Sequence, residues 1–144
     1  MRLFDGQLRV TPDKTKQALL TSLTHTGSLT VQMIDKKPFR RRIDAWFFAL
    51  CLAIKKGLDP VPIENSYNLE YAIVLTDTQQ LFVSLIAMQK EGYEIITDPG
   101  RMLRLSNELA NAGLTELETI LNADDIDPIW NLSEKMKELL EGDA

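Results

Sequence analysis

The hydrophobic pattern of the chain is mainly helical, and its strongest helical segment covers residues 38–56. Apolar residues repeat there every three or four positions, and others fill much of the remaining circumference. A helix that is apolar nearly all round is buried in the centre of a domain. Pro38 suits the first position of a helix, and Gly57 suits its exit. We therefore predict a central buried helix over residues 38–56.

The segments around this helix carry weaker signals. Thr11 and Pro12 form a helix start, and Gly27 is expected to end that helix. Residues 28–34 alternate apolar and polar side chains, which is typical of a strand. Residues 69–75 fit either a strand or a helical turn, because periodicity does not decide for so short a run. The sequence thus leaves room for one short β-strand pair.

The second half of the chain predicts further helices from their capping signals. A capping box begins at Thr76, and Asp98 precedes Pro99 at another helix start. Gly113 follows Asn-Ala and has the character of a left-handed C-terminal cap. We therefore expect that helix to end at Gly113 and a short separate helix to follow. An acidic C-terminal helix is expected over residues 128–141.

Composition and length agree with one domain. Of the 144 residues, 44% are hydrophobic and 26% are charged, which is ordinary for a globular protein. The longest apolar run, residues 45–54, is about half the length of a membrane span. The first ten residues lack the features of a signal peptide, and the single cysteine, Cys51, fits a reducing compartment. We predict a mainly α, compact multi-helix domain of residues 1–144 that is cytoplasmic and has no membrane partner.

The charges of the chain are divided between two regions. The formal net charge is −5, which argues against a broad positive field for nucleic acid. Residues 36–56 nevertheless hold seven cations and one acid, whereas residues 116–143 hold nine acids and two lysines. Trp130 lies in the acidic region, where it either anchors an interface or packs its own helix onto the domain.

The stretch KKPFRRR, residues 36–42, is the most informative part of the sequence. Its five cations, called the basic cluster below, are Lys36, Lys37, Arg40, Arg41 and Arg42. The start of a helix is already positive because its first N–H groups are unpaired, so cations there must be offset by a negative group. Free N–H groups and guanidinium forks together make a competent anion site. The cluster therefore predicts an anion- or partner-binding site, with solvation or pairing to the acidic region as the alternative.

Residues that could carry catalysis are few. His25 is the only histidine and stands alone at a helix end, and Cys51 lies in the most apolar segment, where its reactivity falls. Asp124, Asp125 and Asp127 lack the glycine and glutamate of a calcium loop. The sequence contains no glycine-rich phosphate loop. We therefore predict no catalytic, cofactor or metal residues and a non-enzymatic role.

Two stretches together resemble a known family. The first is an apolar helix that ends in a basic-glycine element and a proline turn, FRRRIDAWFFALCLAIKKGLDPVPI. The second is another apolar helix with an acidic turn, LFVSLIAMQKEGYEII, followed by a further helix, RLSNELANAGLTELETIL. This order resembles small helical proteins associated with bacterial DNA phosphorothioation (Dnd-type) systems. The resemblance implies an accessory subunit that binds DNA or other members of its system, and it transfers no catalytic residues.

Two functional hypotheses follow. The first is a non-enzymatic accessory protein of a prokaryotic DNA-modification or anti-phage defence system, which binds a partner protein of the same system, or DNA, through the basic cluster. The second is an oligomeric scaffold or adaptor with no nucleic-acid role. In that homo-oligomer the basic end of one copy meets the acidic end of another.

Overall fold

The computed structural model describes residues 4, 6–24, 39–122 and 128–141, with the backbone alone for residues 128–131. Its α-helices are α1 (Gln17–Ser22), α3 (Arg42–Lys56), α4 (Asp77–Glu91), α5 (Pro99–Leu121) and α6 (Pro128–Glu141). Its 3₁₀ helices are η1 (Lys14–Lys16), η2 (Ala72–Val74) and η3 (Tyr93–Thr97). The strands β1 (Arg9–Val10) and β2 (Glu70–Tyr71) pair antiparallel. The prediction of a mainly α fold with one short strand pair is confirmed.

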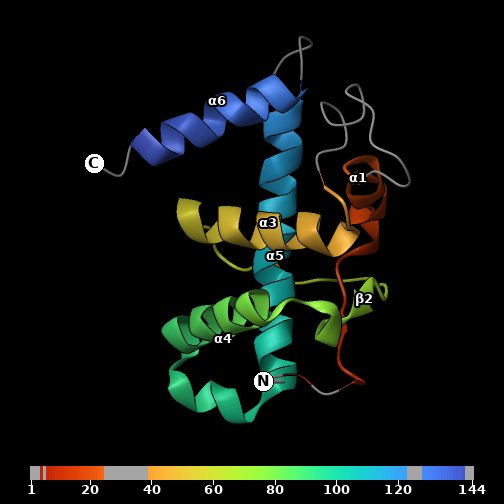
Figure 1. Ribbon diagram of the computed structural model, residues 1–144, viewed down its shortest axis with the longest axis vertical. Helices are drawn as coiled ribbons and strands as arrows, with labels where there is room; N and C mark the ends of the chain where they lie inside the picture. The colour runs from red at the N-terminus through yellow and green to blue at the C-terminus, as the bar shows by residue number, and fades with distance from the viewer. Residues whose placement is uncertain (1–3, 5, 25–38, 123–127, 142–144) are drawn as a thin grey trace.

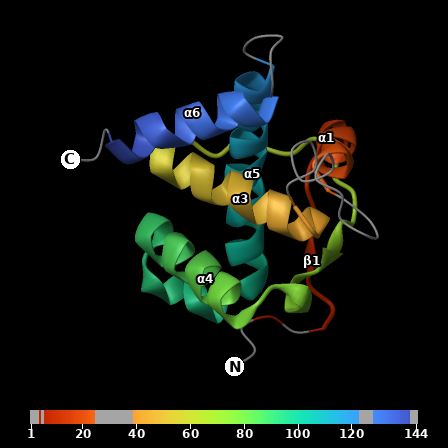
Figure 2. The same ribbon diagram turned by 45° about the horizontal axis from the view of Figure 1, so that its top comes forward.

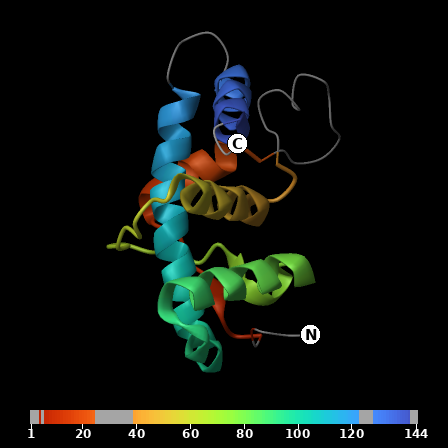
Figure 3. The ribbon, with the colours of Figure 1, turned by 90° about the vertical axis from the view of Figure 1, so that its left-hand side faces the viewer.

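The longest helix, α5, is the element on which the other long helices stack. In Figure 1, α6, α3 and α4 cross the upright α5 one below another. The same order is visible after a turn about the horizontal axis (Figure 2), and Figure 3 shows all three helices projecting from one side of α5. The contact between α3 and α5 is the most extensive, and α1 packs against α3. The buried α3 is therefore central, as predicted, but it shares that place with α5.

Gly113 lies in the middle of α5, so the predicted helix end at this residue is wrong. A Cβ atom at position 113 would lie 2.6 Å from the carbonyl carbon of Ala49 in α3 and closer still to its oxygen. The glycine is required because the two helix backbones approach closely there, rather than because the chain turns. By contrast, Gly57 and Gly92 hold positive φ angles of 65° and 87° at the ends of α3 and α4, which confirms those two stops.

The central helix begins at Arg42, four residues later than predicted. Phe39 forms a bridge with Thr24, and its N–H donates to the carbonyl of Leu23 at 3.1 Å. Arg41 has extended backbone angles, φ −127° and ψ 146°, and is the N-cap. The chain therefore reaches α3 through a bridge residue and a bend at Arg40 and Arg41, and Pro38 lies outside the described residues. Pairing with the Leu23–Thr24 backbone takes the place of the first predicted helical turn.

The N-terminal helix also begins later than predicted. Asp13, rather than Thr11, caps η1, since its Oδ1 accepts a hydrogen bond from the Thr15 N–H at 3.0 Å. These bonds to Thr15 lower the pKa of the Asp13 carboxyl. Gly27 and the predicted strand 28–34 lie outside the described residues. The observed strand pair instead joins β1 to β2, with Arg9 opposite Tyr71 and Val10 opposite Glu70.

The remaining predicted boundaries agree closely with the structure. The capping box at the start of α4 is complete, with Thr76 and Gln79 each bonding the other's backbone N–H. Asp98 caps α5 and accepts from the Arg101 N–H. The acidic C-terminal helix spans Pro128–Glu141 as predicted. The ambiguous segment 69–75 turns out to contain both alternatives, the strand β2 followed by the helical turn η2.

The core lies along the α3–α5 contact and includes two buried amides. Trp46, Leu109 and Leu114 are fully buried. Asn107 accepts from the Thr11 N–H at 3.1 Å, and Asn111 donates to the Val61 carbonyl at 3.3 Å, so α5 holds the segments before α1 and after α3. Among the described residues, no helix is long and apolar enough to cross a membrane.

Candidate anion-binding site

The three arginines of the basic cluster that the structure describes gather around one pocket. This arginine pocket has a volume of about 400 Å³ and is lined by Arg40, Arg41 and Arg42, with Thr21 and Thr24 from the region of α1 and Glu70 from β2 among its other residues. Arg40 and Arg42 are exposed, and Arg41 is half-buried. The other two members, Lys36 and Lys37, lie outside the described residues. Three segments distant in sequence therefore meet at the cluster.

The expectation that all three arginines occupy the first helical turn is wrong. Only Arg42 is in α3, Arg41 is the N-cap, and Arg40 precedes it. Arg41 at the N-cap pairs with Asp44 in the first turn, and this acid offsets part of the unfavourable interaction between cations and the helix N-terminus.

Arg41 is neutralised within the chain. Its Nη2 and Nε donate to the two carboxylate oxygens of Asp44 at 2.8 and 3.0 Å, and its Nη1 donates to the Val74 carbonyl at 3.2 Å. The hydrogen bond from Arg41 lowers the pKa of Asp44 against the opposing effect of burial, and the side chain of Gln79 adds a second bond at 3.2 Å. The Arg41–Asp44 pair therefore ties the start of α3 to η2 through Arg41 and to α4 through Asp44, which is a structural role.

Arg40 and Arg42 have no such partner. Within the described part of the chain, no carboxylate lies at ion-pair distance from either guanidinium. Glu70 lines the same pocket, where its charge acts on Arg41. Arg42 also lies close enough to Tyr67 to oppose the rise that burial causes in the pKa of that phenol. The pocket therefore offers two exposed guanidinium groups for an external anion.

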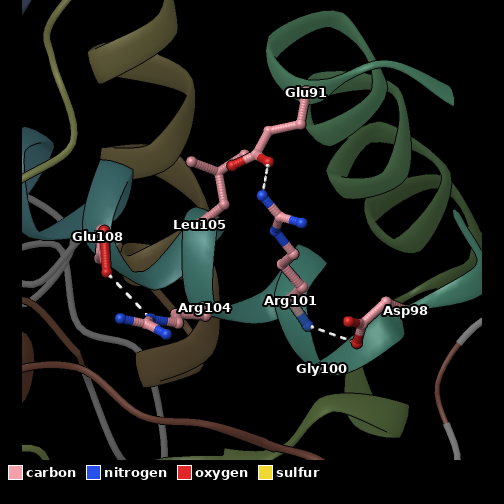
Figure 4. A pocket seen from close by; sticks show the side chains of 7 residues that line it. All are labelled: Glu91, Asp98, Gly100, Arg101, Arg104, Leu105 and Glu108. Carbon is pink, nitrogen blue, oxygen red and sulfur yellow. Dashed lines mark hydrogen bonds and ion pairs between the residues drawn. The ribbon is translucent and has the colours of Figure 1, made fainter. Parts of the chain in front are cut away.

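A second pocket, between α4 and α5, shows the contrasting arrangement. It has a volume of about 600 Å³, and its two arginines come from the first turns of α5 (Figure 4). Arg101 pairs with Glu91 of α4, and Arg104 Nε lies 3.4 Å from Glu108. Both guanidinium groups already have a carboxylate, so this pocket is a weaker candidate for binding an anion.

The residues considered for chemistry do not assemble into a reactive site in the described part of the chain. Cys51 is half-buried, and burial raises the pKa of its thiol to about 11, which suppresses the reactive thiolate. No three side chains of histidine, cysteine, aspartate or glutamate gather there as a metal site would need. His25 and the three aspartates at 124, 125 and 127 lie outside the described residues, as does the side chain of Trp130.

Exposed apolar side chains are the features that sequence reasoning missed. Leu81 and Leu85 of α4 are 47% and 50% exposed. Leu140 of α6, which the helical pattern of residues 128–141 predicts to face inward, is 67% exposed. The sequence pattern does not set Leu140 apart, because Leu132, Met136 and Leu139 share its stripe on the helix.

A scan against protein-family models found no match, and searches of curated proteins and of solved structures found none either.

Proposed function

We propose that this protein acts by binding, as a non-enzymatic accessory protein that takes an anionic group of its partner in the arginine pocket. One observation carries the proposal: Arg40 and Arg42 line the same pocket without a carboxylate at ion-pair distance among the described residues, while the neighbouring Arg41 has one. Guanidinium forks bind carboxylate and phosphate oxygens in pairs, which gives geometric selectivity. Lys36 and Lys37 precede these arginines in sequence and extend the same charge.

The biological setting that we propose follows from the sequence resemblance to Dnd-type proteins. The chain would serve a prokaryotic DNA-modification or anti-phage defence system and bind either DNA or an acidic surface of a protein of that system. In both cases the arginine pocket would contact oxygen anions, namely phosphates on DNA and carboxylates on a protein. Because the arginine pocket is small, it would contact only a few DNA phosphates. A second copy or another subunit would then supply the remaining affinity for DNA.

The test uses two fluorescent probes, a 20-base-pair DNA duplex and a polyglutamate peptide. The variant R40E/R42E is compared with K90E/R104E, which makes the same change in net charge at exposed cations away from the pocket. We expect the wild-type protein and K90E/R104E to shift the anisotropy of at least one probe, and R40E/R42E to lose that shift. If two phosphates are contacted, DNA affinity falls about tenfold between 50 and 200 mM salt.

The outcomes separate the alternatives. Binding of the duplex supports a nucleic-acid partner, and binding of the peptide alone supports an acidic protein partner. If neither probe responds to micromolar protein at low salt, or if both double variants weaken binding equally, the anion-binding function is wrong.

A further inference from the structure

An open apolar groove lies between α3 and α6 and shares no lining residue with the arginine pocket. Its volume is about 710 Å³, and its apolar lining consists of Phe39, Phe48, Leu132, Met136 and Leu140. The ring centroids of Phe39, which precedes α3, and Phe48 of α3 lie 5.4 Å apart, so the side of the groove opposite α6 is a packed aromatic pair. Figure 1 shows α6 and α3 crossing α5 one above the other, and the groove is lined from both of these helices.

The α6 side of the groove is only partly used by the fold. Leu132 and Leu139 pack against the core. Met136 lines the groove, and Leu140, one helical turn further on, is 67% exposed. A leucine exposed to this extent at the mouth of an apolar groove is characteristic of an interface that is filled by another chain.

The charges on the rim of the groove are self-complementary. Lys137 and Glu141 both line it from α6, four residues apart, which is about 6 Å along a helix. No ion pair joins them, although Lys135 and Glu138 of the same helix do pair at 3.5 Å. If two α6 helices cross antiparallel at the level of Leu139, whose own side chain packs into the core, Lys137 of each copy lies opposite Glu141 of the other. Such reciprocal pairing is the property of a two-fold interface.

We propose that this groove binds a second copy of the same chain, so that the protein forms a two-fold dimer through α6. Leu140 of each copy lies next to the symmetry axis and enters the groove of the other copy, against the Phe39–Phe48 pair. The mixed charge on the rim favours a second copy over a nucleic acid or an anionic membrane, both of which Glu141 would repel. The dimer also places two arginine pockets in one particle.

The proposal is tested by light scattering coupled to size-exclusion chromatography, with dissociation constants from sedimentation. We expect the wild-type chain to be a dimer at micromolar concentration and L140E to be monomeric. The matched control is L85E, which introduces the same charge at an exposed leucine of α4 and should remain dimeric. Circular dichroism of each variant confirms that the helices are retained.

Charge reversal gives the decisive test. K137E and E141K each place like charges together at both symmetric contacts, and each should weaken the dimer at least about tenfold. The double variant K137E/E141K should restore it, and a mixture of the two single variants should form heterodimers in preference to either homodimer. R40E/R42E should leave the mass unchanged, whereas the scaffold built from basic-end to acidic-end contacts would lose mass.

A monomeric wild-type chain would overturn the proposal, and so would a dimer that survives L140E. Single variants that weaken the dimer without rescue in the double variant would show that the two α6 helices do not meet in this register. None of these results affects the anion-binding test, which measures probes at the other pocket.

Discussion

Gly113 of α5 faces the backbone of Ala49 in α3 so closely that no side chain fits between them. A Cβ atom there would lie 2.6 Å from the Ala49 carbonyl carbon, a backbone atom that cannot swing aside. The contact between the two central helices therefore depends on the absence of one methyl group.

Gly113→Ala should therefore destabilise the protein, by about 3 kcal/mol, because the helices must separate to admit the methyl group. The measurement is urea unfolding followed by circular dichroism. The control is Gly100→Ala in the first turn of α5, where the nearest atom to an added Cβ is 3.7 Å away. That change should be neutral or stabilising by up to about 1 kcal/mol. Equal stability of the two variants would contradict the close contact.

The Arg41–Asp44 pair should make stability depend on pH in the acid range. The folded chain lowers the pKa of Asp44, so its contribution is present above the unfolded value of about 3.9 and is lost as pH falls through the folded value. Asp44→Asn should cost about 1 kcal/mol at pH 7, because the pair is partly exposed. Unfolding curves at several pH values should show this difference from the wild type shrinking below pH 4. If the stability difference between Asp44→Asn and the wild type stays constant down to pH 2.5, the Arg41–Asp44 pair is not the source of that difference.

Cys51 should react slowly with alkylating reagents. Because burial raises the pKa of its thiol to about 11, the thiolate fraction at pH 8 is small. We expect iodoacetamide to modify the native chain about 100-fold more slowly than the urea-unfolded chain, in which the thiol has its ordinary pKa of about 8.5. The native rate should continue to rise about tenfold per pH unit beyond pH 9, where a free thiol levels off. A native rate equal to the unfolded rate would show that the thiol is solvated.

Asn107 should stabilise the fold through a backbone group of the N-terminal segment. Its Oδ1 accepts from the Thr11 N–H, and its Nδ2 donates to the Thr11 hydroxyl at 3.3 Å. Asn107→Ala leaves that N–H without its acceptor and should cost about 2 kcal/mol in thermal or urea unfolding. Thr11→Val removes only the hydroxyl and should cost about 0.5 kcal/mol. If the two losses are equal, the N–H bond is not the stabilising one.

Local sequence signals were sufficient where one segment determines its own structure. Thr76 and Gln79 satisfy each other's backbone within a single turn, and Asp98 caps α5 across three residues. Such signals need no information from elsewhere in the chain. The starts of α4 and α5 were therefore predicted correctly.

Signals that depend on distant residues were misread. Gly113 has the local features of a helix end, but its role is set by Ala49, 64 positions earlier in the sequence. The start of α3 is likewise set by the pairing of Phe39 with Leu23 and Thr24. For the arginines, the sequence contains the cluster but does not tell which charge is neutralised, because the pairing of Arg41 with Asp44 depends on where α3 begins.

The arrangement of the long helices on α5 has a consequence for the order in which the molecule opens. The contact of α3 with α5 is the most extensive, whereas α6 packs on α5 near its end and leaves an open groove towards α3. The helix α6 can therefore detach from α5 as a unit while the rest of the chain stays folded. In a single copy without its proposed dimer partner, amide hydrogens of α6 would then exchange with solvent through this local opening, long before those of α3 and α5 exchange through global unfolding.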